Sequence, residues 1–432
     1  MKSKLSRKRL LLVGLMLLLM LLITGCAKED EPINIGVFQI TITSPNNATF
    51  TEGTAGTFTV TTTGIANPTL SLTGTLPAGV TFNAATGVLS GTPAFGTSGT
   101  YALVITASNA FSHPTQNFTL TVAAQPITSL TEVAQINNGD AAVAICRGNV
   151  LYTVGWNHTA NSFNIYDMSI PASPVLRGHY NIGNGYGLAL NGNYAYIQTD
   201  GSGDGIFASG TVGVMDITDP DTPTPVMQDA TGYSSAYQTY YHNGYVYNAS
   251  YNIISIYRVS DPATLVHLTN ITTSDVEWAA FSDNYMYAVD DGTLRIWNIT
   301  DPTAPVETGS ATHAGLGWGG VAIKGNYVFA GSSTTAEIFV FDVSDKTNPT
   351  FITSLALTSG TSTTYGEARI LGNYLLITGW NDFYVVNITN PTAPTEVTSI
   401  PLPNTYGWGF DVLNDRYAIV ADDTVYRIIQ LW

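Results

Sequence analysis

The stretch Ile296-Trp297-Asn298-Ile299-Thr300-Asp301-Pro302-Thr303-Ala304-Pro305 decides the fold, because versions of it recur through residues 128–432. Its first half is typical of a β-strand, and its Asp-Pro and second Pro are typical of a tight corner. Related five-residue strands begin at Ile165, Val214, Ile256, Val340, Val385 and Ile428, of which the copy at Ile256 is degenerate. The chain therefore contains seven copies of one unit.

Each copy follows a short apolar strand, a tight turn and a Tyr-rich strand. The turns lie at Gly148-Asn149, Gly192-Asn193, Asn243-Gly244, Asp283-Asn284, Gly325-Asn326, Gly372-Asn373 and Asp415-Arg416, at spacings of 44, 51, 40, 42, 47 and 43 residues. A period in the forties with four strands per unit is typical of a β-propeller blade. We therefore expect an all-β chain with a seven-bladed β-propeller over residues 128–432.

The last blade lacks a fourth strand in its own repeat, because the seventh copy ends at Trp432. An equivalent strand precedes the first repeat: Thr131–Ile136 (TEVAQI) resembles Thr395–Ile400 (TEVTSI), the fourth strand of the sixth copy. An open ring would expose two sheet edges, which favour aggregation. We expect this N-terminal strand to close the propeller.

Residues 36–124 have a different composition, rich in Thr and Gly and nearly free of charge. Alternation as in Phe118-Thr119-Leu120-Thr121-Val122, with frequent turns, predicts an antiparallel β-sandwich. The joining segment Ala123-Ala124-Gln125-Pro126 is short. We therefore expect the two domains to hold a restricted relative orientation.

The N-terminus predicts export. Five basic residues precede the apolar stretch Leu10–Ile23, and Thr24-Gly25-Cys26 follows it. This pattern indicates a signal peptide over residues 1–25, too short for a comfortable membrane span, with an uncleaved anchor as the alternative. Its removal leaves 10 basic against 31 acidic residues, a formal net charge of −21. Such a surface repels nucleic acid and does not attract anionic lipid.

Chain order sorts the loops of a propeller onto two faces. One face carries the Gly/Asn turns and Asp-Pro corners, which local backbone geometry explains. The opposite face is irregular and aromatic, and near its central channel we place a predicted ligand-binding set: Trp156, Tyr186, Trp278, Trp318, Tyr365, Trp380 and Trp408. The alternative is that these rings fill the channel as core.

Support for metal binding or catalysis is thin. Asp200, Ser202 and Asp204 have the spacing of a calcium-loop start, but no Glu stands at its twelfth position, so a flexible loop is the alternative. No other cofactor is expected. Glu277, Glu367 and Asp411 offer carboxylates near the channel mouth, but solvated acids are common in so acidic a chain. The spacing of the histidines does not match a metal site, and the sequence has no Gly-x-Ser-x-Gly nucleophile motif. Cys146 lies in an apolar stretch and fits a small buried position. We expect no enzyme.

The repeats resemble the LVIVD family of bacterial β-propeller repeats over residues 128–432, which implies this fold and an exported location. Leu76–Val80, Thr86–Pro93 and Gly99–Tyr101 resemble the Ig-like, cadherin-like domains of bacterial surface proteins. Calcium at that domain is not expected, because Glu52 is its one carboxylate. Ile23-Thr24-Gly25-Cys26 resembles a bacterial lipobox, which implies lipid on Cys26. Lys28-Glu29-Asp30-Glu31 resembles an acidic export tag, and a charged linker start is the alternative.

The sequence thus predicts a bacterial outer-membrane lipoprotein at the cell surface, with the periplasmic face left open. The expected order along the chain is a signal peptide, a tether over residues 26–35, an Ig-like sandwich over 36–124 and then the propeller. The predicted function is a binding or adhesion module for extracellular glycan or protein, with membrane contact through the lipid alone. The alternatives are a structural or assembly component of the envelope and a glycan-active enzyme at the acidic channel mouth.

Overall fold

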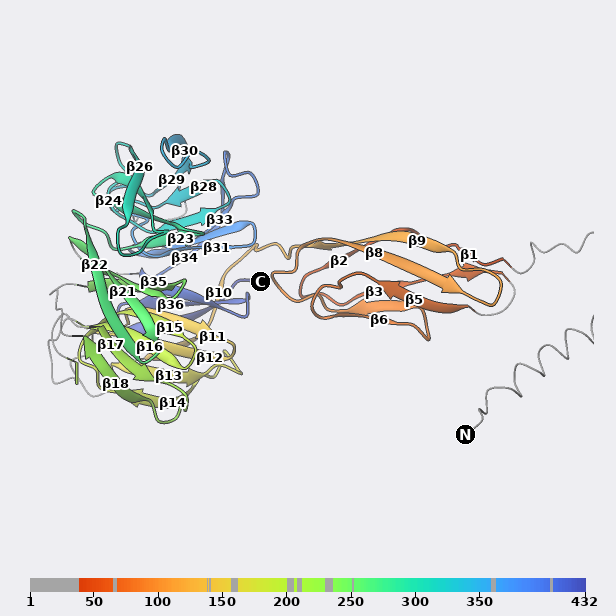
Figure 1. The fold of residues 1–432 in the computed structure, drawn as a ribbon, viewed down its shortest axis with the longest axis horizontal. Helices are drawn as coiled ribbons and strands as arrows, with labels where there is room; N and C mark the ends of the chain where they lie inside the picture. Colours follow the sequence, from red (N-terminus) through yellow and green to blue (C-terminus); the bar gives the residue numbers. More distant parts are fainter. Residues whose placement is uncertain are drawn as a thin grey trace, which may run out of the picture.

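The computed structural model describes residues 39–64, 68–137, 139, 141–156, 162–199, 206–207, 212–229, 236–250, 252–358, 363–404 and 407–432. Over these ranges the chain is all-β and divides into an elongated N-terminal body and a rounder C-terminal one (Figure 1). No helix in this part of the chain is long and apolar enough to span a bilayer. The predicted signal peptide, the tether with Cys26, and the calcium candidates Asp200, Ser202 and Asp204 lie outside these ranges.

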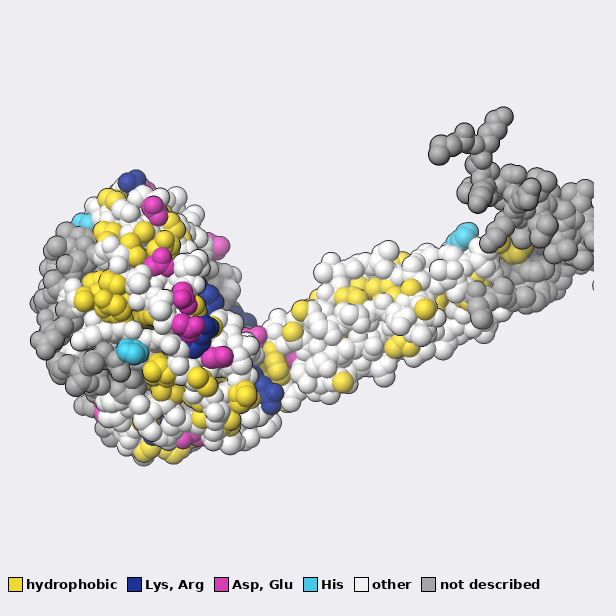
Figure 2. All heavy atoms as spheres, turned by 90° about the horizontal axis from the view of Figure 1, so that it is seen from below, with side chains coloured by type: hydrophobic (Ala, Val, Ile, Leu, Met, Phe, Trp, Pro, Cys, Tyr) yellow, Lys and Arg dark blue, Asp and Glu magenta, His cyan; other side chains and the backbone are white. Residues whose placement is uncertain are grey.

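The N-terminal body contains three sheets. One has four strands in the order β2 (Asn47–Thr51), β9 (Thr115–Ala123), β8 (Gly99–Ser108) and β5 (Thr69–Thr73); another has β3 (Gly56–Thr59), β7 (Val88–Gly91) and β6 (Val80–Asn83); the smallest pairs β1 (Thr41–Ile42) with β4 (Thr62–Thr63). Alternate residues of both larger sheets, including Phe50, Leu89 and Phe118, share one buried core. The face seen in Figure 2 is almost without charged side chains, as the composition predicts.

The described C-terminal body contains seven four-stranded sheets, each of them open. The first repeat forms the sheet β11 (Val143–Arg147), β12 (Val150–Val154), β13 (Phe163–Asp167) and β14 (Val175–Tyr180), and the second forms β15 (Gly185–Asn191), β16 (Tyr194–Thr199), β17 (Val212–Asp216) and β18 (Thr224–Asp229). The third forms β19 (Ala236–His242), β20 (Tyr245–Ser250), β21 (Ile253–Asp261) and β22 (Thr264–Thr272), and the fourth forms β23 (Ala279–Ser282), β24 (Tyr285–Asp290), β25 (Thr293–Asn298) and β26 (Val306–Thr312). The fifth forms β27 (Val321–Lys324), β28 (Tyr327–Ala330), β29 (Glu337–Asp342) and β30 (Thr350–Ala356), and the sixth forms β31 (Ala368–Leu371), β32 (Tyr374–Thr378), β33 (Asp382–Asn387) and β34 (Thr395–Pro401). The four strands of each repeat are thus neighbours in one sheet.

The remaining sheet joins the two ends of the C-terminal body. Its order is β10 (Thr131–Asn137), β37 (Val425–Gln430), β36 (Tyr417–Asp422) and β35 (Gly407–Leu413). β10 runs antiparallel to β37, with Thr131 opposite Gln430 and Ile136 opposite Tyr426. The strand that the sequence assigned to the last repeat therefore occupies the fourth position of that sheet.

Apolar side chains fill the space between successive sheets. One core cluster joins Val154, Phe163 and Ile165 of the first repeat to Leu188 and Ile197 of the second. Equivalent clusters join the later repeats, and another joins the last sheet to the first strand of the first repeat. The edge strand β11 lies against both β35 and β15. The first strand of each repeat therefore lines the middle of this body.

Side-chain hydrogen bonds fix the corners after the third strands. The Asn298 side chain accepts a hydrogen bond from the backbone N–H of Thr300 (2.9 Å), and Asp301 accepts one from Thr303 (3.0 Å). Equivalent pairs of Asp or Asn side chains cap the corners after β17, β29 and β33. The hydrogen bonds that the hydroxyl and backbone N–H of Thr303 donate to Asp301 lower the pKa of that carboxyl group. At the hairpins between first and second strands, on the same face, Gly148 and Gly325 have φ angles of 57° and 59°, which suit glycine. Local geometry therefore explains the repeated motif.

The two bodies meet beside the C-terminus. The ring of Phe95 lies 5.0 Å from that of Trp432, centroid to centroid, and the Tyr374 hydroxyl accepts a hydrogen bond from the Ile127 N–H (3.2 Å). A small crevice here is lined by residues of both bodies, among them Glu52 and Asp415. These contacts agree with the restricted orientation predicted from the short joining segment.

Candidate functional site

Six of the seven predicted aromatic residues form one continuous cluster of rings. The Trp156 ring lies 5.4 Å from Tyr186 and 4.6 Å from Trp408, centroid to centroid. Tyr365 lies 5.5 Å from Trp408, 4.8 Å from Trp318 and 5.5 Å from Trp380. The seventh, Trp278, lines a small cavity together with Trp156, Tyr186 and Trp408. The structure thus brings together residues that are far apart in the sequence.

Burial divides this set into two layers. Trp278 and Tyr365 are 4% and 3% exposed, so they are core residues. Trp156, Tyr186, Trp318, Trp380 and Trp408 are half-buried, and we call these five the aromatic platform. The cavity below them has a volume of about 10 Å³, room for at most one water molecule. The rings therefore block this end of the channel, and the platform offers a surface rather than a deep pocket.

A buried carboxyl group lies under the platform. Glu277 is 4% exposed, lines the small cavity and shares a hydrogen bond with the Tyr365 hydroxyl. Burial raises the pKa of Glu277 to about 8, and the nearby Asp275 adds to the shift. Burial, with Asp290 and Asp291 nearby, also raises the pKa of Asp275 to about 6. Glu277 is therefore protonated near neutral pH.

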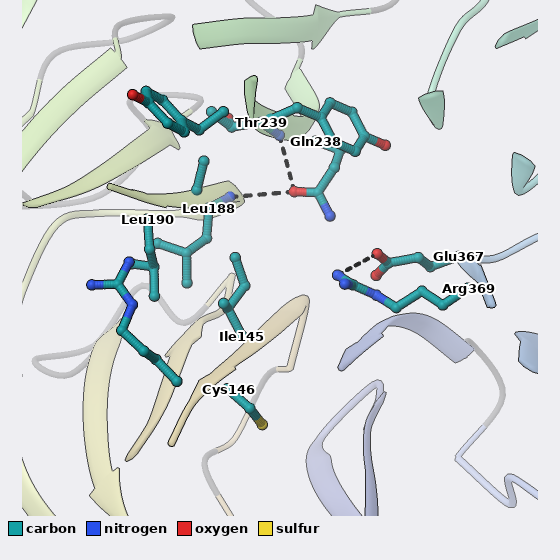
Figure 3. A pocket seen from close by; sticks show the side chains of 12 residues that line it. Ile145, Cys146, Leu188, Leu190, Gln238, Thr239, Glu367 and Arg369 are labelled. Atoms are coloured by element: carbon teal, nitrogen blue, oxygen red, sulfur yellow. Dashed lines mark hydrogen bonds and ion pairs between the residues drawn. The ribbon is translucent and has the colours of Figure 1, made fainter. Parts of the chain in front are cut away.

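The larger cavities lie at the other end of the first strands. One, of about 300 Å³, lies between β11, β15, β19 and β31 and is shown in Figure 3. A second, of about 470 Å³, is lined by β19, β23, β27, β31 and β35. Tyr240, Glu367 and Arg369 border both cavities. The lining residues extend to the Gly/Asn turns. The wider part of the channel therefore opens on the Gly/Asn-turn face, where the sequence predicted no site.

The wall of this channel carries one group of charges. Arg369 contacts the Glu367 carboxylate at 2.7 Å and the Asp411 carboxylate at 3.2 Å. Glu367 also accepts a hydrogen bond from the Phe410 N–H (2.9 Å), and Asp411 one from the Cys146 N–H (2.8 Å). Burial raises the pKa of Glu367, and Arg369 opposes the shift. We call Arg369, Glu367 and Asp411 the charged wall.

The sequence missed Arg369, Tyr240 and Gln238 as channel residues. Arg369 follows Glu367 by two residues, so both lie on one face of a strand, and Asp411 has the equivalent position to Arg369 in the next repeat. That spacing was the available signal. Cys146 is a half-buried free thiol whose pKa burial raises, as expected for an apolar position. Among the described residues, no group of His, Cys, Asp and Glu has a metal-binding arrangement.

The fold is that of a protein with β-propeller-like repeats, and comparison with known proteins agrees. A solved WD40 beta propeller domain of Doa1 is 13% identical with a TM-score of 0.54, covering 71% of this chain and 98% of that one. BamB from Moraxella catarrhalis (14% identity, TM-score 0.47) covers 70% and 98%. A quinonprotein alcohol dehydrogenase-like protein from Bacteroides thetaiotaomicron (11%, TM-score 0.46) covers 93% and 98%. At 13% identity the likeness to the Doa1 domain concerns the fold alone.

Family models identify both bodies. The model described as Putative Ig domain matches residues 39–123. The LVIVD repeat model matches residues 139–182, 275–312, 319–356 and 367–401. The chain therefore has an Ig-like domain at its N-terminal side and LVIVD repeats after it, which confirms both resemblances. No curated protein matches the chain.

Proposed function

We propose that this protein is an exported, lipid-anchored binding module in which an Ig-like sandwich holds a seven-bladed propeller away from the membrane. Seven four-stranded sheets and the β10–β37 pairing support a ring closed by the N-terminal strand. The lipobox-like residues before Cys26 support the anchor, and the acidic stretch after it supports the outer face of the outer membrane.

The aromatic platform is the proposed contact surface for an extracellular glycan or protein segment. Its five half-buried rings come from five different repeats. Trp156 contacts Tyr186 and Trp408, and the Tyr365 ring links Trp408 to the remaining two, Trp318 and Trp380. Rigid rings at a surface supply large contact area at low entropic cost, and the apolar faces of sugar rings or flat side chains stack on them. This continuous set of rings is the observation that carries the proposal.

Replacing two outer rings tests the platform. We expect the Trp318→Ala and Trp380→Ala variants to fold as the parent does, because both side chains are half-buried. Each is expected to weaken binding by about 2 kcal/mol, roughly 30-fold. The measurement is saturable binding of the full chain to purified polysaccharides and a protein array. Phe111→Ala is the matched control, since Phe111 is 61% exposed in the N-terminal body. Unchanged binding in both tryptophan variants, or lost stability without lost binding, would contradict the proposal.

A second candidate is an assembly role in the envelope, favoured by apolar side chains on the outer strands. They are exposed on five successive repeats: Val175 and Leu176, Val226, Val266, Val306, and Phe351 and Ile352. In the last two sheets the positions equivalent to Val306 carry Thr395 and Thr131 instead. Stoichiometric co-purification of an envelope protein, lost on Val175→Ser and Val306→Ser substitution, would support assembly over ligand binding.

The geometry gives catalysis little support. The cavity beside Glu277 has no room for a sugar ring, and Glu367 and Asp411 are both engaged by Arg369. We therefore propose a binding role without turnover.

A further inference from the structure

The channel beside the charged wall has the size and lining of a small-molecule site. Its two cavities of about 300 and 470 Å³ fall in the range of ~300–1,000 Å³ that ligand pockets occupy. Polar and apolar residues share the lining, with Leu188 and Ala280 beside polar groups such as Gln238, Glu367 and Arg369. The aromatic rings block the far end. The channel is thus a blind cup that is entered from the Gly/Asn-turn face.

Polar groups converge on this cup from opposite sides. Figure 3 shows Glu367 and Arg369 reaching into it from one wall, while the side-chain amide nitrogen of Gln238 points into it from another. The Gln238 side-chain oxygen is held by the N–H groups of Leu188 (3.3 Å) and Thr239 (2.9 Å), which fixes this orientation. The side chain of Arg369 is 35% exposed although it contacts two carboxylates. Donors and acceptors in the cup are therefore pre-positioned, and the Arg369 side chain is the more accessible partner in both ion pairs.

Charges of both signs line the cup, because Arg147 borders one cavity and Asp415 the other, beside the charged wall. An anion that approaches Arg369 meets the carboxylates of Glu367 and Asp411, and a cation that approaches those carboxylates meets Arg369. A hydroxyl group both donates and accepts, so it satisfies a carboxylate and a guanidinium or amide at once. Several adjacent hydroxyls on a compact ring match such a mixed set, and leave apolar C–H faces for the aliphatic lining.

We propose that the charged-wall channel binds an uncharged, polyhydroxylated small molecule of the monosaccharide or polyol class. This site is separate from the aromatic platform, and entry is from the face beside which the N-terminal body stands. Asp415 lines both the channel and the crevice between the two bodies, and the backbone of Gly96 comes close to its carboxylate. The N-terminal domain therefore borders the entrance.

The test is thermal shift and titration calorimetry of the full chain, purified in detergent, against neutral monosaccharides and polyols. Glucuronate and acetate serve as anionic probes, and glucosamine as a cationic one. We expect at least one neutral sugar to bind and to raise Tm, with both charged classes at least tenfold weaker. No binding by any neutral sugar or polyol, or tighter binding of a charged probe, would overturn the proposal.

Three variants locate the site. Arg369→Met removes the guanidinium, Tyr240→Phe removes a channel hydroxyl, and Ala280→Phe fills space without touching the charges. Each folded variant should lose at least tenfold in sugar affinity. Ala280→Phe keeps the test valid if Arg369→Met fails to fold because Glu367 is left unpaired. Phe111→Ala, at an exposed ring of the N-terminal body, should leave this binding unchanged. Sugar binding that survives Ala280→Phe and Tyr240→Phe, or that is lost in Trp318→Ala alone, would place the sugar elsewhere and contradict the channel site.

Discussion

At the residue scale, Glu277 is a carboxyl group held almost out of contact with water. It is enclosed by Trp278, Trp156 and Trp408, and its partner is the Tyr365 hydroxyl. Ionising it would place a charge among rings, which is why burial dominates the shift of its pKa to about 8. Its protonated form keeps the rings packed.

This predicts a pH dependence of stability. The folded protein keeps a proton on Glu277 up to about pH 8, whereas the unfolded chain loses it near 4.5. Because the folded state binds more protons in this window, the free energy of unfolding falls as pH rises through it. Glu277→Gln should be more stable than the parent at pH 8, by roughly 2–4 kcal/mol, and similar to it at pH 4. Urea unfolding at both pH values measures this, and an equal gain at pH 4 would contradict it.

Sequence reasoning located the platform but not its depth. Chain order placed Trp318, Trp380 and Trp408 at one mouth, and the structure groups them there. The burial of Trp278 and Tyr365 depends on which neighbouring rings cover them, and strand periodicity carries no such information. Of the charged wall, Glu367 and Asp411 were named from the sequence and Arg369 was missed, because its contact with Asp411 depends on the fold.

At the element scale, one ion-pair triad occurs in two sheets. In the sheet of β23–β26, Arg295 contacts Asp290 (2.9 Å) and Glu307 (3.0 Å). In the last sheet Arg427 contacts Asp422 (2.5 Å) and Glu132 (2.6 Å). Glu307 follows its arginine in the same repeat, whereas Glu132 comes from β10 near the other end of the body. The second triad thus ties the N-terminal strand to the C-terminal one.

Removing the arginine should be more harmful in the last sheet. The Arg427 side chain is 7% exposed against 31% for Arg295. Arg427→Met strands a fully buried Asp422, which costs about 3 kcal/mol by analogy with broken buried pairs. The matched Arg295→Met should cost less, about 1 kcal/mol, because the buried Asp290 keeps hydrogen bonds from the N–H groups of Ser274 and Asp275. Chemical unfolding of both variants at pH 7 gives the comparison, and equal losses would show that the triad has no special role at β10.

Much of the element order was predictable from the sequence. The repeat boundaries follow from local signals, because Gly or Asn favours the hairpin conformation and Asp or Asn caps the corners. The place of β10 followed because Thr131–Ile136 shares its pattern with Thr395–Ile400. The long β21–β22 hairpin was not foreseen; there Arg258 stands where five other copies have Asp or Asn.

At the scale of the whole molecule, contact between the two bodies rests on few side chains. Phe95 meets Trp432, while Ile127 anchors the joining segment against β32 through the Tyr374 hydroxyl. Such a small junction limits the relative motion of the domains only while its apolar contact is present.

Loss of that contact should loosen the junction. We expect Phe95→Ala to leave both bodies folded and to broaden the distribution of overall dimensions in small-angle X-ray scattering. Phe111→Ala, which removes an exposed ring of the same domain, is the control. If the scattering profiles of Phe95→Ala and of the control both coincide with that of the parent, the short joining segment alone sets the orientation of the domains.

The central claim is that residues 131–137 complete the last sheet and so close the ring. Thr131 and Gln430 are partners across β10 and β37. Paired residues of antiparallel strands have Cα atoms about 4.5–5.5 Å apart, within the range of a disulfide. Thr131→Cys/Gln430→Cys should therefore form an intramolecular disulfide under mild oxidation, detected by peptide mass spectrometry, while Thr131→Cys/Thr395→Cys, whose strands are not paired, should not. The account would be contradicted if the Thr131→Cys/Gln430→Cys variant kept free thiols or formed disulfide-linked dimers while the Thr131→Cys/Thr395→Cys variant became crosslinked.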